Sequence, residues 1–252
     1  MRYLYKGLLL CVSFCICLTP ESLPAQNHYR RFSYFGAEIG LKSEIYRVRD
    51  NGTELSRRQS FSRGLSGVVL EQELNRYLSA GTGLYFSKYG TDFGFRRDEG
   101  RVDFPSMQTV MIPLRLQATL PIYYGIPELR IKPGVGLTGV VNRSYFRDSI
   151  YGKIAPVLSD QYSGTMRYDI RDFYWLAEAG LHLELLFAKG IVASLSTRYQ
   201  KGFTKVAETT VNYRIDKKSY SGTLSSSGDF FNFSLSIRYP ISRLWQKRIG
   251  RM

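Results

Sequence analysis

Hydrophobic and polar residues alternate along much of this chain with a period of two. The stretch "DFYWLAEAGLHLELLF", from Asp172 to Phe187, shows the pattern best. Its apolar set is Phe173, Trp175, Ala177, Ala179, Leu181, Leu183, Leu185 and Phe187. The intervening positions include Glu178, His182 and Glu184. Successive side chains of a strand point to opposite faces. The pattern therefore predicts one strand, about three times the usual length of ~5–6 residues, apolar on one face and charged on the other.

Seven further segments show the same alternation, and with the first they make eight. They lie near residues 33–45, 65–74, 78–89, 109–119, 131–141, 191–200 and 231–239. Most reach ten residues or more, whereas a tilted strand needs about 9–11 residues to cross a bilayer. Such lengths are typical of membrane-spanning strands rather than of strands in soluble domains.

The connectors between these segments alternate between long and short. Long polar stretches lie near 46–63, 91–106, 143–171 and 203–228, and shorter links lie at 75–76, 121–128 and 188–190. This alternation is typical of outer-membrane barrels, which have long external loops and short periplasmic turns. The sequence therefore predicts an all-β fold, an eight-stranded antiparallel up-and-down transmembrane β-barrel. A secreted β-sandwich is the alternative, but it gives no reason for alternating connector lengths.

The charged face of these strands must point into the barrel. An Arg or Lys that faces lipid at the bilayer midplane costs about 2–4 kcal/mol. Five basic positions facing lipid would therefore cost on the order of 10–20 kcal/mol, against a net stability of about 5–15 kcal/mol. The predicted lumenal network consists of Glu38, Lys42, Glu71, Glu73, Arg115, Lys132, Glu178, His182, Glu184, Arg198 and Arg238.

Aromatic residues fall at both ends of the predicted strands, where a membrane barrel carries its interfacial girdles. The loop ends hold Phe86, Phe173, Trp175, Tyr199, Phe231 and Phe233, and the turn ends hold Phe187 and Tyr239. Pro113 lies inside the fourth segment and lacks the N–H that a closed ladder needs. We expect a β-bulge at this proline.

The first 26 residues have the layout of a secretory signal peptide. Arg2 and Lys6 precede the apolar run from Gly7 to Leu18, which is too short for a spanning helix. We expect cleavage near Ala25 or Gln26; the alternative is a buried N-terminal helix. The domains expected are therefore a signal peptide (1–26), an outer-membrane barrel (27–241) and a basic periplasmic tail (242–252).

The three cysteines, Cys11, Cys15 and Cys17, all lie in the predicted signal peptide. A lipoprotein is conceivable, but none of the three follows the small residue that a lipid-attachment site prefers. The exported chain would then contain no cysteine. This excludes disulfides, thiol catalysis and cysteine-ligated zinc.

The net charge of +14 falls only to +13 without residues 1–26, which contain Arg2, Lys6 and Glu21. For an exported strand-rich chain, anionic lipid or lipopolysaccharide is a more natural partner than nucleic acid. The first long loop concentrates this charge. Its arginines are candidate contacts for lipopolysaccharide phosphates, although a solvated basic loop fits equally well: Arg47, Arg49, Arg57, Arg58 and Arg63.

Chemistry-bearing motifs are scarce in the sequence. It holds only two histidines, His28 and His182, and shows no phosphate-binding loop or metal-spaced cluster. His182 shares the inward face with Glu178 and Glu184, an arrangement that suits a lumenal network better than an acid–base pair. We therefore expect no enzyme activity, no cofactor and no bound metal.

An eight-stranded barrel encloses a space that side chains just fill. The inward face carries five acidic and five basic residues, so a salt-bridged interior is expected rather than an open pore. Two other functions stay open, a lipid-A-modifying outer-membrane enzyme and a narrow, porin-like solute channel.

Several stretches together resemble an outer-membrane barrel family that includes PorT. They are "GVVLEQELNRYLSAGTGLYFSKYG" (67–90), "MIPLRLQATLPI" (111–122), "KPGVGLTG" (132–139), "EAGLHLELL" (178–186) and "TRYQKGF" (197–203). The resemblance implies a monomeric eight-stranded barrel of the OmpX or OmpA-domain architecture. It also implies a non-enzymatic accessory or scaffold in type IX protein secretion, with secretion-machinery proteins as partners. The family offers no catalytic residues, and the basic tail departs from its usual ending at the last strand.

Overall fold

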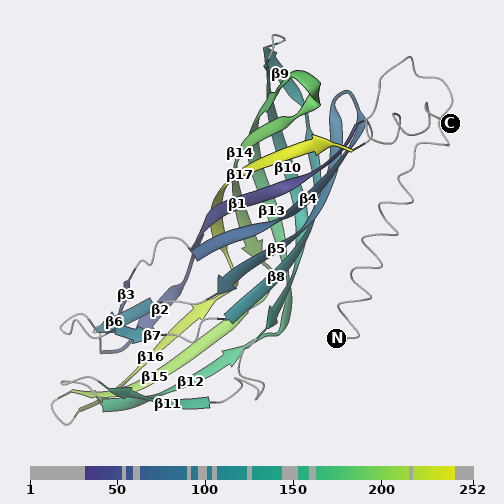
Figure 1. The fold of residues 1–252 in the computed structure, drawn as a ribbon. Helices are drawn as coiled ribbons and strands as arrows, with labels where there is room; N and C mark the ends of the chain where they lie inside the picture. The colour runs from purple at the N-terminus through teal and green to yellow at the C-terminus, as the bar shows by residue number, and fades with distance from the viewer. Residues whose placement is uncertain are drawn as a thin grey trace.

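The fold is a β-barrel whose wall continues past one rim into a smaller set of strands (Figure 1). The computed structural model describes residues 32–52, 55–58, 63–89, 92–95, 101–103, 107–123, 127–143, 153–158, 163–215 and 218–241. The predicted signal peptide and the predicted tail lie outside the described residues, so both stay predictions.

Eight strands close the barrel. In chain order they are β1 (Ser33–Glu44), β4 (Arg63–Asn75), β5 (Leu78–Tyr89), β8 (Met107–Ala118), β10 (Glu128–Arg143), β13 (Phe173–Leu186), β14 (Val192–Gly202) and β17 (Phe230–Pro240). Each pairs antiparallel with the strand before and after it, and β1 pairs with β17 to complete the ring. The predicted eight-stranded up-and-down barrel is therefore confirmed, and every predicted segment coincides with one of its strands.

Short turns join the strands at one end of the barrel, which we call the turn end. Arg76 and Tyr77 link β4 to β5, and the 3₁₀ turn η1 (Ala188–Gly190) links β13 to β14. Lys189 in this turn has a φ of 70°, a left-handed conformation that few non-glycine residues adopt. The short strand β9 (Leu120–Tyr123) extends β8 toward the turn end and pairs with β10.

Pro113 does not produce the bulge that we expected. The β5–β8 register is the same on both sides of the proline, since Thr82 pairs with Leu114 and Tyr85 pairs with Met111. The ladder lacks only the pairs of Gly83 and Leu84 with the proline region. The Thr82 hydroxyl donates a hydrogen bond of 2.8 Å to the Pro113 carbonyl. The strand thus loses local pairing at the proline without changing its register.

The other end of the barrel, the loop end, carries strands that the sequence reading took for polar loops. A five-stranded sheet runs in the order β11 (Lys153–Leu158), β12 (Ser163–Ile170), β15 (Ala207–Ile215), β16 (Lys218–Ser226) and β2 (Arg47–Asp50). A three-stranded sheet contains β3 (Leu55–Arg58), β6 (Asp92–Phe95) and β7 (Arg101–Asp103). We call these two sheets the head. Figure 1 shows the head continuing away from the barrel rim.

The outer wall of the barrel is an apolar band. Large apolar side chains along all eight strands are exposed, as with Ile39, Leu137, Leu195 and Ile237. Contiguous exposed apolar surface of this extent is rare on soluble proteins and is the surface that a membrane barrel presents to lipid. Among the described residues, no helix is long and apolar enough to span a bilayer.

The polarity of the wall inverts at the loop-end rim. In the barrel the outward side chains are apolar and the inward ones are polar. In the head the inward side chains Val211, Tyr213 and Leu224 are at most 4% exposed, whereas Arg47 and Arg214 face solvent. A strand packs apolar side chains away from water and polar ones toward it. The inversion therefore marks a change of surroundings from lipid to water at this rim.

The loop end of the lumen is closed by an apolar layer. Its buried side chains come from six barrel strands and one connector, and they are Leu65, Tyr85, Met111, Val140, Tyr174, Leu176, Val206 and Phe230. Leu176 and Val140 have no exposed surface. The layer separates the polar lumen from the head.

The apolar band predicts a position-dependent response to an introduced charge. Leu235 lies on the outer wall between Ile39 and Leu195, so Leu235→Arg places a cation in the middle of the band. We expect a loss of about 2–4 kcal/mol in the free energy of unfolding in lipid vesicles. Asn212→Arg on the exposed face of β15 is the matched control and should change it by less than about 0.5 kcal/mol. Urea titration measures both, and equal losses would contradict a lipid-facing wall.

Candidate functional site

The structure places all eleven residues of the predicted lumenal network inside the barrel. Each is at most 9% exposed, although seven of the eight barrel strands contribute at least one of them. Burial of so many ionised groups is costly unless each charge finds a partner. The partners lie in four clusters stacked along the lumen.

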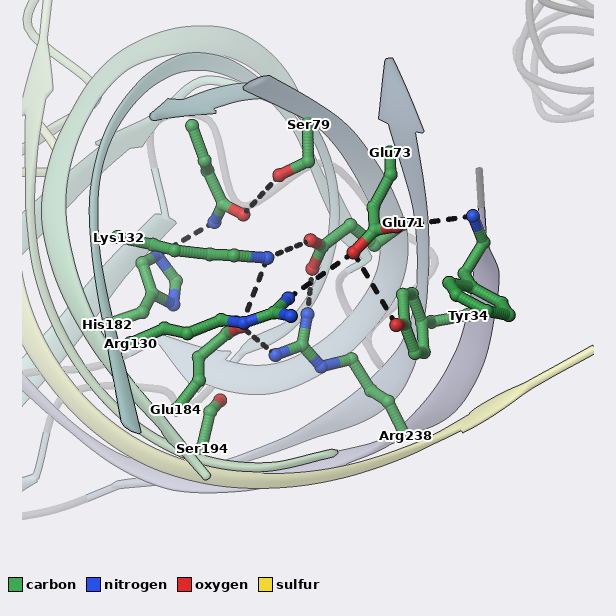
Figure 2. A network of polar contacts seen from close by, with 12 residues as sticks. Tyr34, Glu71, Glu73, Ser79, Arg130, Lys132, His182, Glu184, Ser194 and Arg238 are labelled. Carbon is green, nitrogen blue, oxygen red and sulfur yellow. Dashed lines mark hydrogen bonds and ion pairs between the residues drawn. The ribbon is translucent and has the colours of Figure 1, made fainter. Parts of the chain in front are cut away.

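The first cluster joins two carboxylates and two cations from four strands (Figure 2). The Lys132 ammonium on β10 lies 2.5 Å from Glu71 on β4 and 3.0 Å from Glu184 on β13. Arg238 on β17 forms ion pairs with the same two carboxylates. The four formal charges cancel, and each carboxylate bridges two cations across the lumen.

The second cluster is organised around Tyr85 on β5. The Tyr85 hydroxyl donates to Glu38 at 2.9 Å and accepts a hydrogen bond from Arg115 at 2.7 Å. Arg115 also pairs with Glu178 at 2.5 Å, and Arg198 pairs with Glu38. The guanidinium groups of Arg115 and Arg198 lie 5.1 and 5.9 Å from the Tyr85 ring centroid, within cation–π range. Tyr85 therefore connects two ion pairs that would otherwise be separate.

The third cluster closes the turn end around Glu73. Its carboxylate accepts hydrogen bonds from the Phe32 backbone N–H at 3.2 Å and from the Tyr34 hydroxyl at 3.5 Å. Arg130 lies 3.4 Å from Glu73 and 2.9 Å from Glu128. Figure 2 shows Tyr34 and Arg130 converging on this carboxylate.

The fourth cluster is a local pair near the loop end. Lys42 pairs at 2.7 Å with Glu44, two residues further on the same face of β1. The Lys42 ammonium also lies 4.7 Å from the ring centroid of Phe230 in the apolar layer. This cluster joins the polar lumen to that layer.

His182 stands between the first two clusters but forms no ion pair with either. Its Nδ1 lies 2.7 Å from the Ser196 hydroxyl and its Nε2 lies 3.0 Å from the Gln117 amide. Both ring nitrogens are thus engaged by neutral partners. A buried ring held in this way suits a structural role better than proton transfer to a bound substrate.

Inward glycines make room for the long cations. A Cβ added at Gly36 would meet Arg238, and one added at Gly180 would meet Arg198. A small lumenal cavity beside Glu71, Arg115 and His182 has a volume of about 10 Å³. That is room for about one water molecule. Among the described residues, no group of His, Cys, Asp and Glu is arranged to hold a metal ion.

The structure describes the side chains of two of the five predicted lipid-contact arginines. Arg47 and Arg49 lie on β2 with exposed side chains. Arg57 and Arg58 belong to β3 and Arg63 begins β4, but the side chains of these three lie outside the described residues. Only the first two can be placed in a site.

The sequence reading missed several residues that complete the network. Tyr85 has the inward parity of β5, but it is not among the residues predicted for the network. Glu44 and Arg130 were not included, although both follow the inward periodicity of β1 and β10. Strand parity alone would have found all three.

No family model and no curated protein matches this sequence. The resemblance to the family that includes PorT therefore stays a prediction. Among solved structures, the outer membrane protein OprG from Pseudomonas aeruginosa aligns with a TM-score of 0.44 and 7% identity, over 84% of this chain and 98% of OprG. For AlkL in DMPC lipid bilayers the TM-score is 0.41 and the identity is 16%, over 88% of this chain and 96% of AlkL. For the outer membrane protease OmpT from Escherichia coli the TM-score is 0.39 and the identity is 9%, over 86% of this chain and 100% of OmpT.

These likenesses are weak, and they carry no argument about function. The fold assignment rests on the chain's own closed strand ladder.

Removing one carboxylate from the first cluster should destabilise the barrel strongly. Glu71→Gln leaves Lys132 and Arg238 with a single carboxylate between them, and we expect a loss of about 3–5 kcal/mol in the free energy of unfolding. Glu208→Gln breaks the surface pair with Lys205 and should cost about 0–1 kcal/mol. Chemical unfolding in detergent measures both. Similar losses for the two variants would show that Lys132 and Arg238 do not depend on Glu71 as a buried counter-charge.

Proposed function

We propose that this chain is an integral outer-membrane β-barrel without enzyme activity, which acts as a scaffold that holds its head at the cell surface. The apolar band and the inversion of polarity at the loop-end rim support this placement. The long connectors of the loop end would face outward and the short turns would face the periplasm.

The filled lumen is the observation that carries the non-porin part of the proposal. Four ion-pair clusters occupy the lumen and the apolar layer covers its loop end. A solute would have to break several buried ion pairs and displace large side chains to pass. We infer a barrel that is closed at rest.

The absence of enzyme activity is inferred from the surroundings of the groups that could react. His182 is held by Ser196 and Gln117 in the lumen, away from the lipid that a lipid-modifying barrel would need to reach. The carboxylates beside it are engaged by Lys132, Arg115 and Arg238. The cavity that the described residues form beside His182, Glu71 and Arg115 has a volume of about 10 Å³, which is too small for a substrate.

The head supplies the surface for partners. It is a β-sheet extension with its own buried core, which includes Leu55, Val211 and Tyr213, so its outer face is held rigidly. A rigid surface raised above the membrane suits docking of another protein. The narrower role, an accessory of protein secretion, rests on the sequence resemblance.

The closed lumen predicts an absence of steady current. Purified protein inserted into a planar bilayer should give little conductance compared with a porin inserted in the same way. Tyr85→Ser with Arg198→Ser removes two of the largest fully buried side chains and should raise the conductance. Large uniform channels from the unmodified protein would overturn the closed-barrel proposal in favour of a solute channel.

The scaffold role predicts that the protein leaves the membrane with partners attached. Affinity purification from native outer membranes in mild detergent, followed by mass spectrometry, should recover secretion-machinery subunits. Recovery of lipid alone would count against the secretion role. Altered lipid A mass in a deletion strain would favour the enzyme instead. Absence of the protein from the outer-membrane fraction would overturn the membrane placement itself.

A further inference from the structure

A polar cavity of about 410 Å³ lies at the loop-end rim, where barrel and head meet. Its lining comes from β2, the start of β15, the end of β16 and the links next to them, and it includes Arg47, Arg49, Lys205, Thr223 and Ser225. The volume falls within the range of about 300–1,000 Å³ that is typical of small-ligand pockets. Strand residues of the head and the links that join them to the barrel thus form one cavity.

The cavity has an excess of positive charge. Its two carboxylates already have partners, since Glu208 pairs with Lys205 at 2.5 Å and Asp229 pairs with Lys201 at 2.7 Å. Asp229 also accepts a hydrogen bond of 2.8 Å from the Gly202 backbone N–H. In the part of the chain that the structure describes, neither Arg47 nor Arg49 contacts a carboxylate.

Hydroxyl groups lie beside the two arginines. In the β16–β2 register Thr223 pairs with Arg49 and Ser225 pairs with Arg47, so all four side chains share one face of the sheet. Paired guanidinium groups with adjacent hydroxyl donors match the oxygens of a phosphate group, which an Arg can bind with two parallel hydrogen bonds. The cavity is therefore suited to a phosphate rather than to an apolar ligand.

The barrel wall directly next to the cavity is apolar. On the outer face of β1 and β17, Leu41 pairs with Phe233, and Phe231 lies one pair closer to the rim. Leu41 and Phe233 are 56% and 60% exposed. Phe231 also contacts the Tyr199 ring, with a centroid distance of 4.7 Å. An amphiphile could place its chains on these residues while its headgroup reached the arginines.

We infer that this rim cavity binds the phosphate of an outer-leaflet lipid headgroup, with Arg47 and Arg49 as its principal ligands. The inference rests on the proposed membrane placement, which sets the cavity at headgroup depth. It differs from a diffuse basic loop, because the site combines β2 with residues from the last long connector.

The test measures lipid binding by the full chain in an uncharged, phosphate-free detergent, with the Kd and stoichiometry taken from native mass spectrometry. The probes are lipid A with both phosphates, its dephosphorylated form, and inorganic pyrophosphate. Arg47→Gln with Arg49→Gln removes the two principal ligands. Arg214→Gln with Lys218→Gln is the control, because it removes the same charge from the exposed β15–β16 end of the head. Heat-dependent migration on gels verifies that each variant is folded.

We expect one lipid A to bind at least about tenfold more tightly than its dephosphorylated form, since charge-assisted hydrogen bonds to phosphate supply the difference. The Arg47/Arg49 variant should weaken lipid A binding by about tenfold or more, and the control should leave it within about twofold. Equal weakening by both variants would reduce the effect to overall charge and overturn the site. Equal binding of the dephosphorylated lipid would overturn it as well.

Pyrophosphate distinguishes the source of the phosphate. If it bound as tightly as lipid A and lost binding in the Arg47/Arg49 variant, the ligand would be a soluble phosphate and the lipid assignment would be wrong. This outcome is independent of the proposed scaffold role. If the protein fractionates with the outer membrane but does not bind lipid A in these titrations, only the inference of the rim site is overturned. If the protein is absent from the outer-membrane fraction, the proposed membrane placement is overturned, whatever the titrations show.

Discussion

The structure depends on neutralising charge inside a closed space. Lipid on the outside confines the ionised side chains in the middle of the barrel strands to the lumen, and the narrow lumen leaves little water to solvate them. Each charge must therefore be met by a counter-charge, in most cases on another strand, as Glu71 is met by Lys132 and Arg238. Buried ion pairs of this kind add little net stability compared with an apolar core. They instead favour one strand register and one way of closing the barrel, because any other arrangement would leave buried charges unpaired.

The same period-two alternation builds two environments with opposite polarity. Along β17 the outward Phe233 faces the apolar surroundings and the inward Ser234 faces the lumen. Along β16, which leads into β17, the inward Leu224 is buried and the outward Thr223 is polar. The rim between them holds the basic cavity where we infer that a lipid headgroup binds, next to the head. Depth in the membrane is thus encoded in the strand pattern itself.

Strand positions in the barrel could be predicted from the sequence because lipid and lumen impose contrasting faces over ten or more residues. The head was missed for a different reason. β15 alternates Val211 and Tyr213 with Asn212 and Arg214 just as clearly. Its segment is more polar than the barrel strands, however, and was therefore interpreted as part of a hydrophilic loop. The network was foreseeable as a set of inward residues, whereas its pairing was not. Which carboxylate meets which cation depends on strand stagger and side-chain length, and Tyr85 joins two ion pairs that lie far apart in the sequence.

The way the network crosses the lumen has a consequence for biogenesis. Arg238 on the last strand pairs with Glu71 on the second barrel strand and with Glu184 on the sixth, so its partners are brought together only when β17 meets β1. Before that seam forms, an open sheet in the bilayer would expose Glu71, Lys132 and Glu184 without their full complement of counter-charges. Each such group is expensive in hydrocarbon. Insertion and seam closure are therefore coupled, and a half-inserted intermediate would need an assembly factor or a locally thinned bilayer to shelter its charged face.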